Sequence, residues 1–281
     1  MANLKFHVCF LFFCASSLNL VCCHSLSKDH VAFFLFGDSL FDSGNNNYIN
    51  TIAKANFWPY GETLFKYPTG RFSDGRLIPD FIAEYAKLPL IPPYLQPGNH
   101  HFSYGVNFAS AGAGALVETN KGLARDLKTQ IGYFKYVAKQ LRLKLGDAKA
   151  ERVLSKAVYF ISIGTNDYVY PILTNSTVPK SLWDEYVGTV IGNLTTNVKE
   201  IYNVGERKFG FLSPGQLGGI PILRMLVTAL RKQALTKALQ ELQSQLEGFK
   251  YANHNSSVFL SEIVEEPSKL GEKIREDEES S

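Results

Sequence analysis

Several short stretches of the chain are apolar at almost every position and end at a glycine, a proline or a small polar residue. Stretches of this kind are typical of strands that are buried on both faces of a parallel sheet. The pattern therefore predicts five strands, at residues 31–36, 105–109, 158–163, 208–213 and 257–261.

Between these stretches, apolar residues recur every three or four positions, which is the spacing of one face of a helix. The predicted helices cover residues 77–86, 123–145, 182–204 and 221–249. The last helix carries a leucine stripe whose spacing would suit a coiled-coil dimer, but the repeat is short and a core-facing helix is the more ordinary interpretation. Strands that alternate with helices indicate an α/β fold with a mainly parallel sheet.

The first 23 residues differ from the rest. Lys5 is followed by an apolar run that extends to Cys23, and two small residues, Val21 and Cys23, lie three and one positions before His24. This arrangement predicts a secretory signal peptide over residues 1–23. The alternative is an uncleaved membrane anchor, since the run approaches the length of a spanning helix.

All four cysteines, Cys9, Cys14, Cys22 and Cys23, lie in this segment. A chain cleaved near His24 has no cysteine, which excludes a disulfide framework, a cysteine metal site and a thiol nucleophile. Three N-glycosylation acceptors agree with secretion: Asn175, Asn193 and Asn255. We therefore expect a secreted protein, extracellular or in a cell wall, without stable membrane insertion after cleavage.

Composition and charge exclude several classes of protein. The 281 residues are 45% hydrophobic and 20% charged, unlike disordered, collagen-like or polytopic membrane proteins. The net charge of +3 is too balanced to suggest a nucleic-acid partner. Eight acids and three bases lie between Glu262 and Ser281, which is typical of a solvated tail.

Candidate chemical groups follow three successive predicted strands. Ser39 comes two residues after the glycine that ends the first, the glycine-rich stretch 110–114 follows the second, and Asn166 follows the third. Ligands of parallel α/β folds bind beyond the carboxyl ends of the strands. A serine beside backbone and amide N–H donors describes an acyl-transfer site, because the donors stabilise the charge of a tetrahedral intermediate.

Each group also has an ordinary structural explanation. The Gly-Asp-Ser motif could be a turn, the Ala-Gly-Ala-Gly motif a packing surface and the Asn-Asp pair a helix cap. Likewise, Arg71 and Arg76 could contact an acidic substrate group, although a solvated turn is the simpler interpretation. The coincidence of the three motifs at successive strand ends is what favours catalysis.

These motifs resemble those of plant-type GDSL esterases/lipases of the SGNH hydrolase superfamily. The resemblance runs from Phe33 to about Lys269 and is carried by blocks at residues 36–46, 59–61, 68–76, 105–114 and 163–168. It implies a three-layer α/β/α sandwich around a five-stranded, mainly parallel sheet of flavodoxin-like type. It also implies hydrolysis of carboxylic esters, such as lipid or other small-molecule acyl esters, without a metal or organic cofactor.

The resemblance also implies roles for individual residues. Ser39 would be the nucleophile, and the backbone of Ser39 and Gly112 and the side chain of Asn166 would form the oxyanion hole. Gly112 matches the family pattern better than Gly114. Three carboxylates would support the site by orienting its loops: Asp38, Asp42 and Asp167.

The chain departs from the family near its carboxyl end, because it lacks the Asp-x-x-His motif that supplies the family's general base. The expected organisation is a signal peptide at 1–23, a hydrolase domain at 24–269 without that motif, and an acidic tail at 270–281, as in a truncated relative. Loss of the catalytic histidine in a serine hydrolase costs on the order of a million-fold in turnover. We therefore expect a weak or inactive esterase.

No other histidine is expected to replace the base. His24 lies at the new terminus, and four others precede predicted strands and thus belong at the amino ends, opposite Ser39: His30, His100, His101 and His254. The leading hypothesis is a secreted esterase/lipase that forms an acyl-enzyme on Ser39. The alternatives are a non-catalytic relative that binds an acyl ligand or a partner, and a fragment that does not fold stably; the oligomeric state is open.

Overall fold

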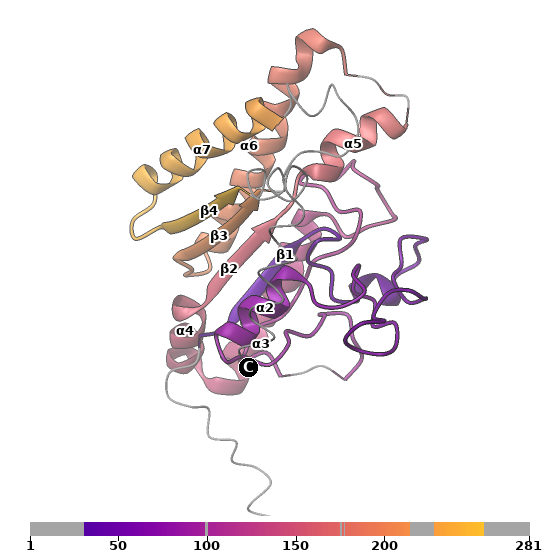
Figure 1. The fold of residues 1–281 in the computed structure, drawn as a ribbon. Helices are drawn as coiled ribbons and strands as arrows, with labels where there is room; N and C mark the ends of the chain where they lie inside the picture. Colours follow the sequence, from indigo (N-terminus) through magenta and orange to yellow (C-terminus); the bar gives the residue numbers. More distant parts are fainter. Residues whose placement is uncertain (1–30, 99–100, 175, 177, 214–227, 256–281) are drawn as a thin grey trace, which may run out of the picture. The chain divides into compact units, whose positions relative to one another are not determined.

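The computed structural model describes residues 31–98, 101–174, 176, 178–213 and 228–255. Four strands form one parallel sheet in the order β1-β2-β3-β4 (Figure 1). The strands are β1 at Phe33–Gly37, β2 at Val158–Ser162, β3 at Lys208–Ser213 and β4 at Lys250–Asn255. Three predicted strands are confirmed, with ends within two residues of the predicted ones.

The predicted strand at 105–109 lies along the outer edge of β1. The backbone N–H of Leu35 donates to the carbonyl of Val106 at 3.0 Å, and the N–H of Phe108 donates to the carbonyl of Leu35 at 2.8 Å. The pairing amounts to a parallel bridge between Leu35 and Asn107, so the described sheet has four strands and not the predicted five. The last predicted strand, 257–261, lies outside the described residues.

The sequence pattern does not predict β4, whose six residues follow directly on the predicted 221–249 helix. As the end strand of the sheet, β4 is hydrogen-bonded only to β3 among the described strands. Its residues mix lysine, tyrosine, alanine, asparagine and histidine, and it lacks the continuous apolar run of a strand covered on both faces.

Helices lie on both sides of the sheet. They are α2 at Ile78–Tyr85, α3 at Leu127–Leu145, α4 at Asp147–Lys156, α5 at Thr165–Leu173, α6 at Trp183–Tyr202 and α7 at Thr228–Gln245, with short 3-10 turns η1 at Asn45–Tyr48 and η2 at Lys180–Leu182. The first three predicted helices are confirmed with shorter bounds, and α7 confirms the fourth, whose predicted residues 221–227 lie outside the described residues. The pattern misses α4, which buries only Ala150 and Leu154, and α5, which contains Pro171.

Local chemistry explains why α3 begins where it does. The Asp126 carboxylate accepts a hydrogen bond from the backbone N–H of Thr129 at 3.0 Å and so caps the first turn. The helix ends at Gly146, whose φ of 78° is left-handed. Between these points, Ile131, Phe134 and Leu141 face the core.

The main core lies between one sheet face and helices α3, α6 and α7. Phe34 and Tyr159 stack with ring centres 5.3 Å apart, and the Tyr159 ring also packs against Phe209 of β3, with ring centres 5.8 Å apart. The leucine stripe of α7 belongs to this core, because Leu235, Leu239 and Leu242 are buried in it. The core-facing interpretation of α7 is therefore confirmed.

A smaller core lies on the other sheet face, where Phe33, Leu35 and Phe41 pack with Ala83 of α2. Helix α2 thus covers the β1 side of this face. None of the helices in the described part of the chain is long and apolar enough to cross a membrane.

Candidate active site

Ser39 lies in a tight turn directly beyond the carboxyl end of β1. The backbone N–H of Asp38 donates to the carbonyl of Ser162 at 3.2 Å, which ties the start of the turn to β2. The carbonyl of Asp38 then accepts hydrogen bonds from the N–H groups of Phe41 and Asp42, at 3.1 and 3.0 Å. Ser39 is partly exposed.

Asp42 joins this turn to two neighbouring segments. Its carboxylate is buried and accepts hydrogen bonds from the backbone N–H groups of Gly44 and Asn45, at 2.8 and 2.7 Å. The second oxygen accepts the N–H of Ala111 at 2.9 Å. The carboxylate therefore holds the 110–114 stretch against the turn of Ser39, as the resemblance implies for a loop-orienting residue.

The 110–114 stretch contains two glycines with different surroundings. Gly112 is partly exposed and has a φ of 85°, and its carbonyl accepts a hydrogen bond from the Asn120 side chain at 2.8 Å. Gly114 is buried, and a Cβ atom there would collide with the side chains of Asp167 and Thr119. Glycine is thus required at 112 by the backbone and at 114 by close packing.

Asn166 is the second residue of α5 and points back to the same stretch. Its amide donates one N–H to the carbonyl of Ala113 at 2.9 Å. The next residue, Asp167, is fully buried and accepts hydrogen bonds from the N–H groups of Ala115 and Leu116, at 2.8 and 3.0 Å, and from the Thr119 hydroxyl at 2.6 Å. The Asn-Asp pair therefore anchors a loop and does not cap its own helix.

These hydrogen bonds bring the three predicted motifs together at one edge of the sheet. The 110–114 stretch lies between the Ser39 turn and the start of α5, bonded to the first through Asp42 and to the second through Asn166. Sequence reasoning gave no role to Asn46, which is also buried here. Its side chain accepts the Ser110 hydroxyl hydrogen at 2.6 Å and donates to the carbonyl of Ala111 at 3.0 Å.

Burial changes the acidity of the supporting carboxyl groups. It raises the pKa of Asp38 to about 7, although the N–H of Leu40 and the charge of Arg231 oppose the change. It raises the pKa of Asp42 to about 6, although backbone N–H donors, first those of Ala111 and Gly44, oppose the change. The pKa of Asp167 is raised for the same reason.

Sequence reasoning also missed Arg231 of α7. This side chain is buried, and its guanidinium lies 5.8 Å from the centre of the Tyr168 ring. Burial lowers the pKa of Arg231, while Tyr168, Asp38 and Asp167 counteract that effect. One feature of the sequence could have indicated that Arg231 is buried. It lies four residues before Leu235, on the same side of α7 as the buried leucines.

The structure corrects the expected position of His254. The residue does not precede the last described strand but lies within β4, paired with Leu212 near the carboxyl ends of the strands. It is thus on the edge of the sheet that carries Ser39. Three strand spacings separate β4 from β1, about 14 Å, so His254 is beyond hydrogen-bond reach of Ser39.

Two arginines of the sequence motifs have structural partners. Arg71 is buried and forms two hydrogen bonds with Asp80, at 2.8 and 3.1 Å. Arg76 pairs with Glu84 at 3.0 Å on the surface. The solvated-turn interpretation is therefore wrong for Arg71, whose charge is neutralised inside the protein.

Some residues singled out in the sequence lie outside the described part of the chain, and others lie on described helices or strands. The predicted signal peptide, its cysteines, His30, His100 and Asn175 lie outside the described residues. Asn193 is exposed on α6, and Asn255 is the last residue of β4. Among the residues that are described, no three His, Cys, Asp or Glu side chains gather into a metal site.

Comparisons with known proteins agree with the motifs. The family described as GDSL-like lipase/acylhydrolase matches residues 33–277. The chain is 52% identical to GDSL esterase/lipase 1 of Arabidopsis thaliana, over 91% of this chain and 73% of that protein. It is 46% identical to GDSL esterase/lipase 4 of Arabidopsis thaliana over 96% of this chain and 79% of that protein. It is 48% identical to a GDSL lipase of Tanacetum cinerariifolium, over 87% and 69% respectively.

Proposed function

Because this chain belongs to the GDSL-like lipase/acylhydrolase family, and so to the carboxylic ester hydrolases, we propose that Ser39 is its nucleophile. The observation that carries the proposal is the hydrogen-bonded junction of the Ser39 turn, the Gly112 stretch and Asn166. Three motifs that are distant in the sequence meet at one sheet edge, where α/β folds bind ligands.

In the proposed reaction, the Ser39 hydroxyl oxygen attacks the ester carbonyl carbon as a base takes the hydroxyl proton. The tetrahedral oxyanion accepts hydrogen bonds from the backbone N–H groups of Ser39 and Gly112 and from the Asn166 amide. The intermediate collapses to an acyl-enzyme, and the alcohol leaves with a proton. Water then attacks the acyl carbonyl, which releases the carboxylic acid and restores the Ser39 hydroxyl.

The surroundings of the glycines support Gly112 over Gly114 as the oxyanion donor. Gly112 is partly exposed in a left-handed turn, whereas Gly114 packs tightly against Asp167 and Thr119. The Asn166 amide uses one N–H on the carbonyl of Ala113, which orients its second N–H for a substrate. Asp38, Asp42 and Asp167 would act only by holding these loops.

A general base is not evident in the 281 residues, because the sequence contains no Asp-x-x-His motif. Of the two histidines in the described part of the chain, His101 is exposed in the loop before residues 105–109, and His254 lies three strands from β1. We therefore expect this chain to be a weak esterase. Solvent water or hydroxide would then have to take the Ser39 proton, so the acylation step would be slow.

The finer parts of the proposal are a secreted location and a lipid or other acyl ester as substrate. The apolar segment at 1–23 and the exposed acceptor Asn193 on α6 support secretion. Expression in a eukaryotic secretory host tests this proposal. We expect the medium to contain a chain that begins near His24 and that loses a glycan, seen as a gel shift, in Asn193→Gln. A chain retained in the membrane fraction with an intact Met1 would contradict it.

The catalytic proposal is tested by hydrolysis of a short-chain p-nitrophenyl ester by the purified chain and by Ser39→Ala. Ser244→Ala, at an exposed serine of α7, is the matched control. We expect slow hydrolysis that Ser39→Ala abolishes and Ser244→Ala leaves unchanged. Equal rates for all three proteins would overturn the acyl-enzyme. Ester binding that survives in such a case would favour the alternative, a non-catalytic acyl-binding relative.

A further inference from the structure

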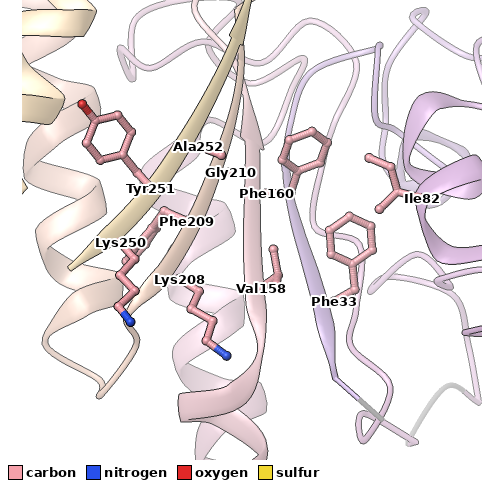
Figure 2. A pocket seen from close by; sticks show the side chains of 10 residues that line it. All are labelled: Phe33, Ile82, Val158, Phe160, Lys208, Phe209, Gly210, Lys250, Tyr251 and Ala252. Carbon is pink, nitrogen blue, oxygen red and sulfur yellow. The ribbon is translucent and has the colours of Figure 1, made fainter. Parts of the chain in front are cut away.

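The sheet face opposite the main core carries an apolar groove of about 420 Å³ (Figure 2). Phe33, Val158 and Phe160 form its floor on β1 and β2, and Ala252 continues it on β4. Ile82 of α2 forms one wall. The side chains of Lys208 and Lys250 stand at its rim, at the amino ends of β3 and β4.

Strand register explains why the face is hollow at this point. Phe160 is paired with Gly210, and Gly210 is paired with Ala252, so three neighbouring strands present one large side chain, none and a methyl group. The Phe160 ring leans over Gly210, where an added Cβ would lie 2.6 Å from a ring carbon. The hollow is therefore built into the sequence of the strands.

The described helices do not cover this half of the face. Helix α2 packs beside β1, whereas α3, α6 and α7 pack on the opposite face. Ala252 is exposed although it lies in a strand, and Phe160 is only partly buried. Parallel sheets are found almost always with both faces covered, because apolar strand surface is costly to leave in water.

We propose that residues 256–281 of the same chain occupy this groove. The segment follows directly on Asn255, the last residue of the edge strand that borders the groove. Its 26 residues could extend over roughly 80 Å, several times the length of β4, so the chain is long enough to return along the face. Its first part is also rich in apolar side chains: Val258, Phe259, Leu260, Ile263 and Val264.

Charge complementarity supports the same occupant. Residues 262–281 contain eight acids and three bases, and the rim of the groove carries the exposed Lys208 and Lys250. In the paired strands these two lysines are direct neighbours, which places like charges side by side. Acidic side chains laid beside them would relieve that repulsion and fix the orientation of the segment.

The test measures how fast a bulky maleimide labels a cysteine in the groove of the full-length chain. The four natural cysteines are replaced by serine, and Ile82→Cys supplies the reporter. Tyr85→Cys is the matched control, since Tyr85 lies one turn further along α2 and is 93% exposed. Phe259→Ser together with Leu260→Ser removes the proposed apolar anchors without shortening the chain.

We expect Ile82→Cys to react about tenfold faster once Phe259 and Leu260 are serine, while Tyr85→Cys is unaffected. Lys208→Glu with Lys250→Glu should likewise expose the reporter, and adding Glu265→Lys with Glu266→Lys should restore its protection. Lys139→Glu with Lys149→Glu, at exposed positions of α3 and α4, is the charge control. Labelling of Ile82→Cys that is independent of residues 256–281 would overturn the proposal. So would protection that disappears on dilution, which would indicate a second copy in the groove.

Discussion

The Asp42 carboxylate accepts the backbone N–H of Ala111 at 2.9 Å and so joins two turns that are 69 residues apart in the chain. One turn presents Ser39 and the other contains Gly112. Because the same carboxylate also accepts the N–H groups of Gly44 and Asn45, its removal would leave three backbone donors without their partner.

Replacing Asp42 with alanine should destabilise the protein by about 3 kcal/mol, since each buried donor that loses its acceptor costs about 1 kcal/mol or more. Urea unfolding followed by tryptophan fluorescence measures the change. Asp74→Ala removes an exposed carboxylate, and its unfolding midpoint should stay close to that of the parent protein. A similar midpoint for Asp42→Ala and Asp74→Ala would contradict the assigned role.

The two glycines of the 110–114 stretch should respond differently to a methyl group. Gly112→Ala is expected to lower the free energy of unfolding by about 1 kcal/mol. There is room for the methyl group, and only the left-handed backbone conformation disfavours alanine. Gly114→Ala should cost about 3 kcal/mol, because the methyl group meets Asp167 and Thr119.

Calorimetric melting temperatures distinguish these cases, with Gly188→Ala as control. Gly188 lies in α6 with open space around its Cβ position, so this change should stabilise the helix by about 0.5 kcal/mol or more. If Gly112→Ala melts lower than Gly114→Ala, the contrast drawn between the two positions is wrong.

The ion pair between Arg71 and Asp80 should contribute far more to stability than the pair between Arg76 and Glu84. Arg71→Met leaves a buried carboxylate without its cation and should cost about 3 kcal/mol. Arg76→Met breaks an exposed pair and should cost about 0.5 kcal/mol or less. Equal denaturation midpoints for the two variants would argue against a structural role for Arg71.

Stability should fall as the pH rises from about 4 to 7. Burial raises the pKa of Asp38 from 3.8 to about 7, so the folded chain holds this proton more tightly than the unfolded chain. This stabilisation is fully present below the pKa that Asp38 has in the unfolded chain. It is lost as the pH rises through the pKa that Asp38 has in the folded chain. The loss has a limit of about 1.4 kcal/mol per pH unit for one group.

Asp38→Asn isolates this contribution, because asparagine can still accept the N–H of Leu40 but does not titrate. Unfolding free energies of both proteins should be measured at pH 4.5, 6 and 7.5. We expect the unfolding free energy of the variant to increase relative to that of the parent as the pH rises. A constant difference between the two proteins would show that Asp38 does not titrate in this range.

Local pattern predicted the interior strands and the chemical groups best, because both leave strong signals. Strands β1 and β2 are apolar along most of their length, and the motifs around Ser39 and Asn166 follow two of the predicted strands directly. Strand β4 left no such signal, since its residues mix polar and apolar types and do not form a continuous apolar run. The misplacement of His254 followed from that omission.

Residues that act across long distances in the sequence were harder to predict. Arg231 belongs to the site region only because α7 packs against the sheet that carries Asp38. Asn46 is one of three consecutive asparagines, and only the fold shows that it bonds to Ser110 and Ala111. Such partners depend on tertiary packing, which periodicity does not encode.

The pairing of β1 with β2 sets an order of events during synthesis. Phe33 lies beside Val158, and the 104–110 segment that lines the other edge of β1 also comes much later in the chain. At ribosomal rates of about 5–20 residues per second, β1 waits roughly ten seconds for β2. Until residues 104–110 are made, this phenylalanine-rich strand has both edges unpaired, and the edge that pairs with β2 stays open for longer, which exposes the nascent chain to aggregation.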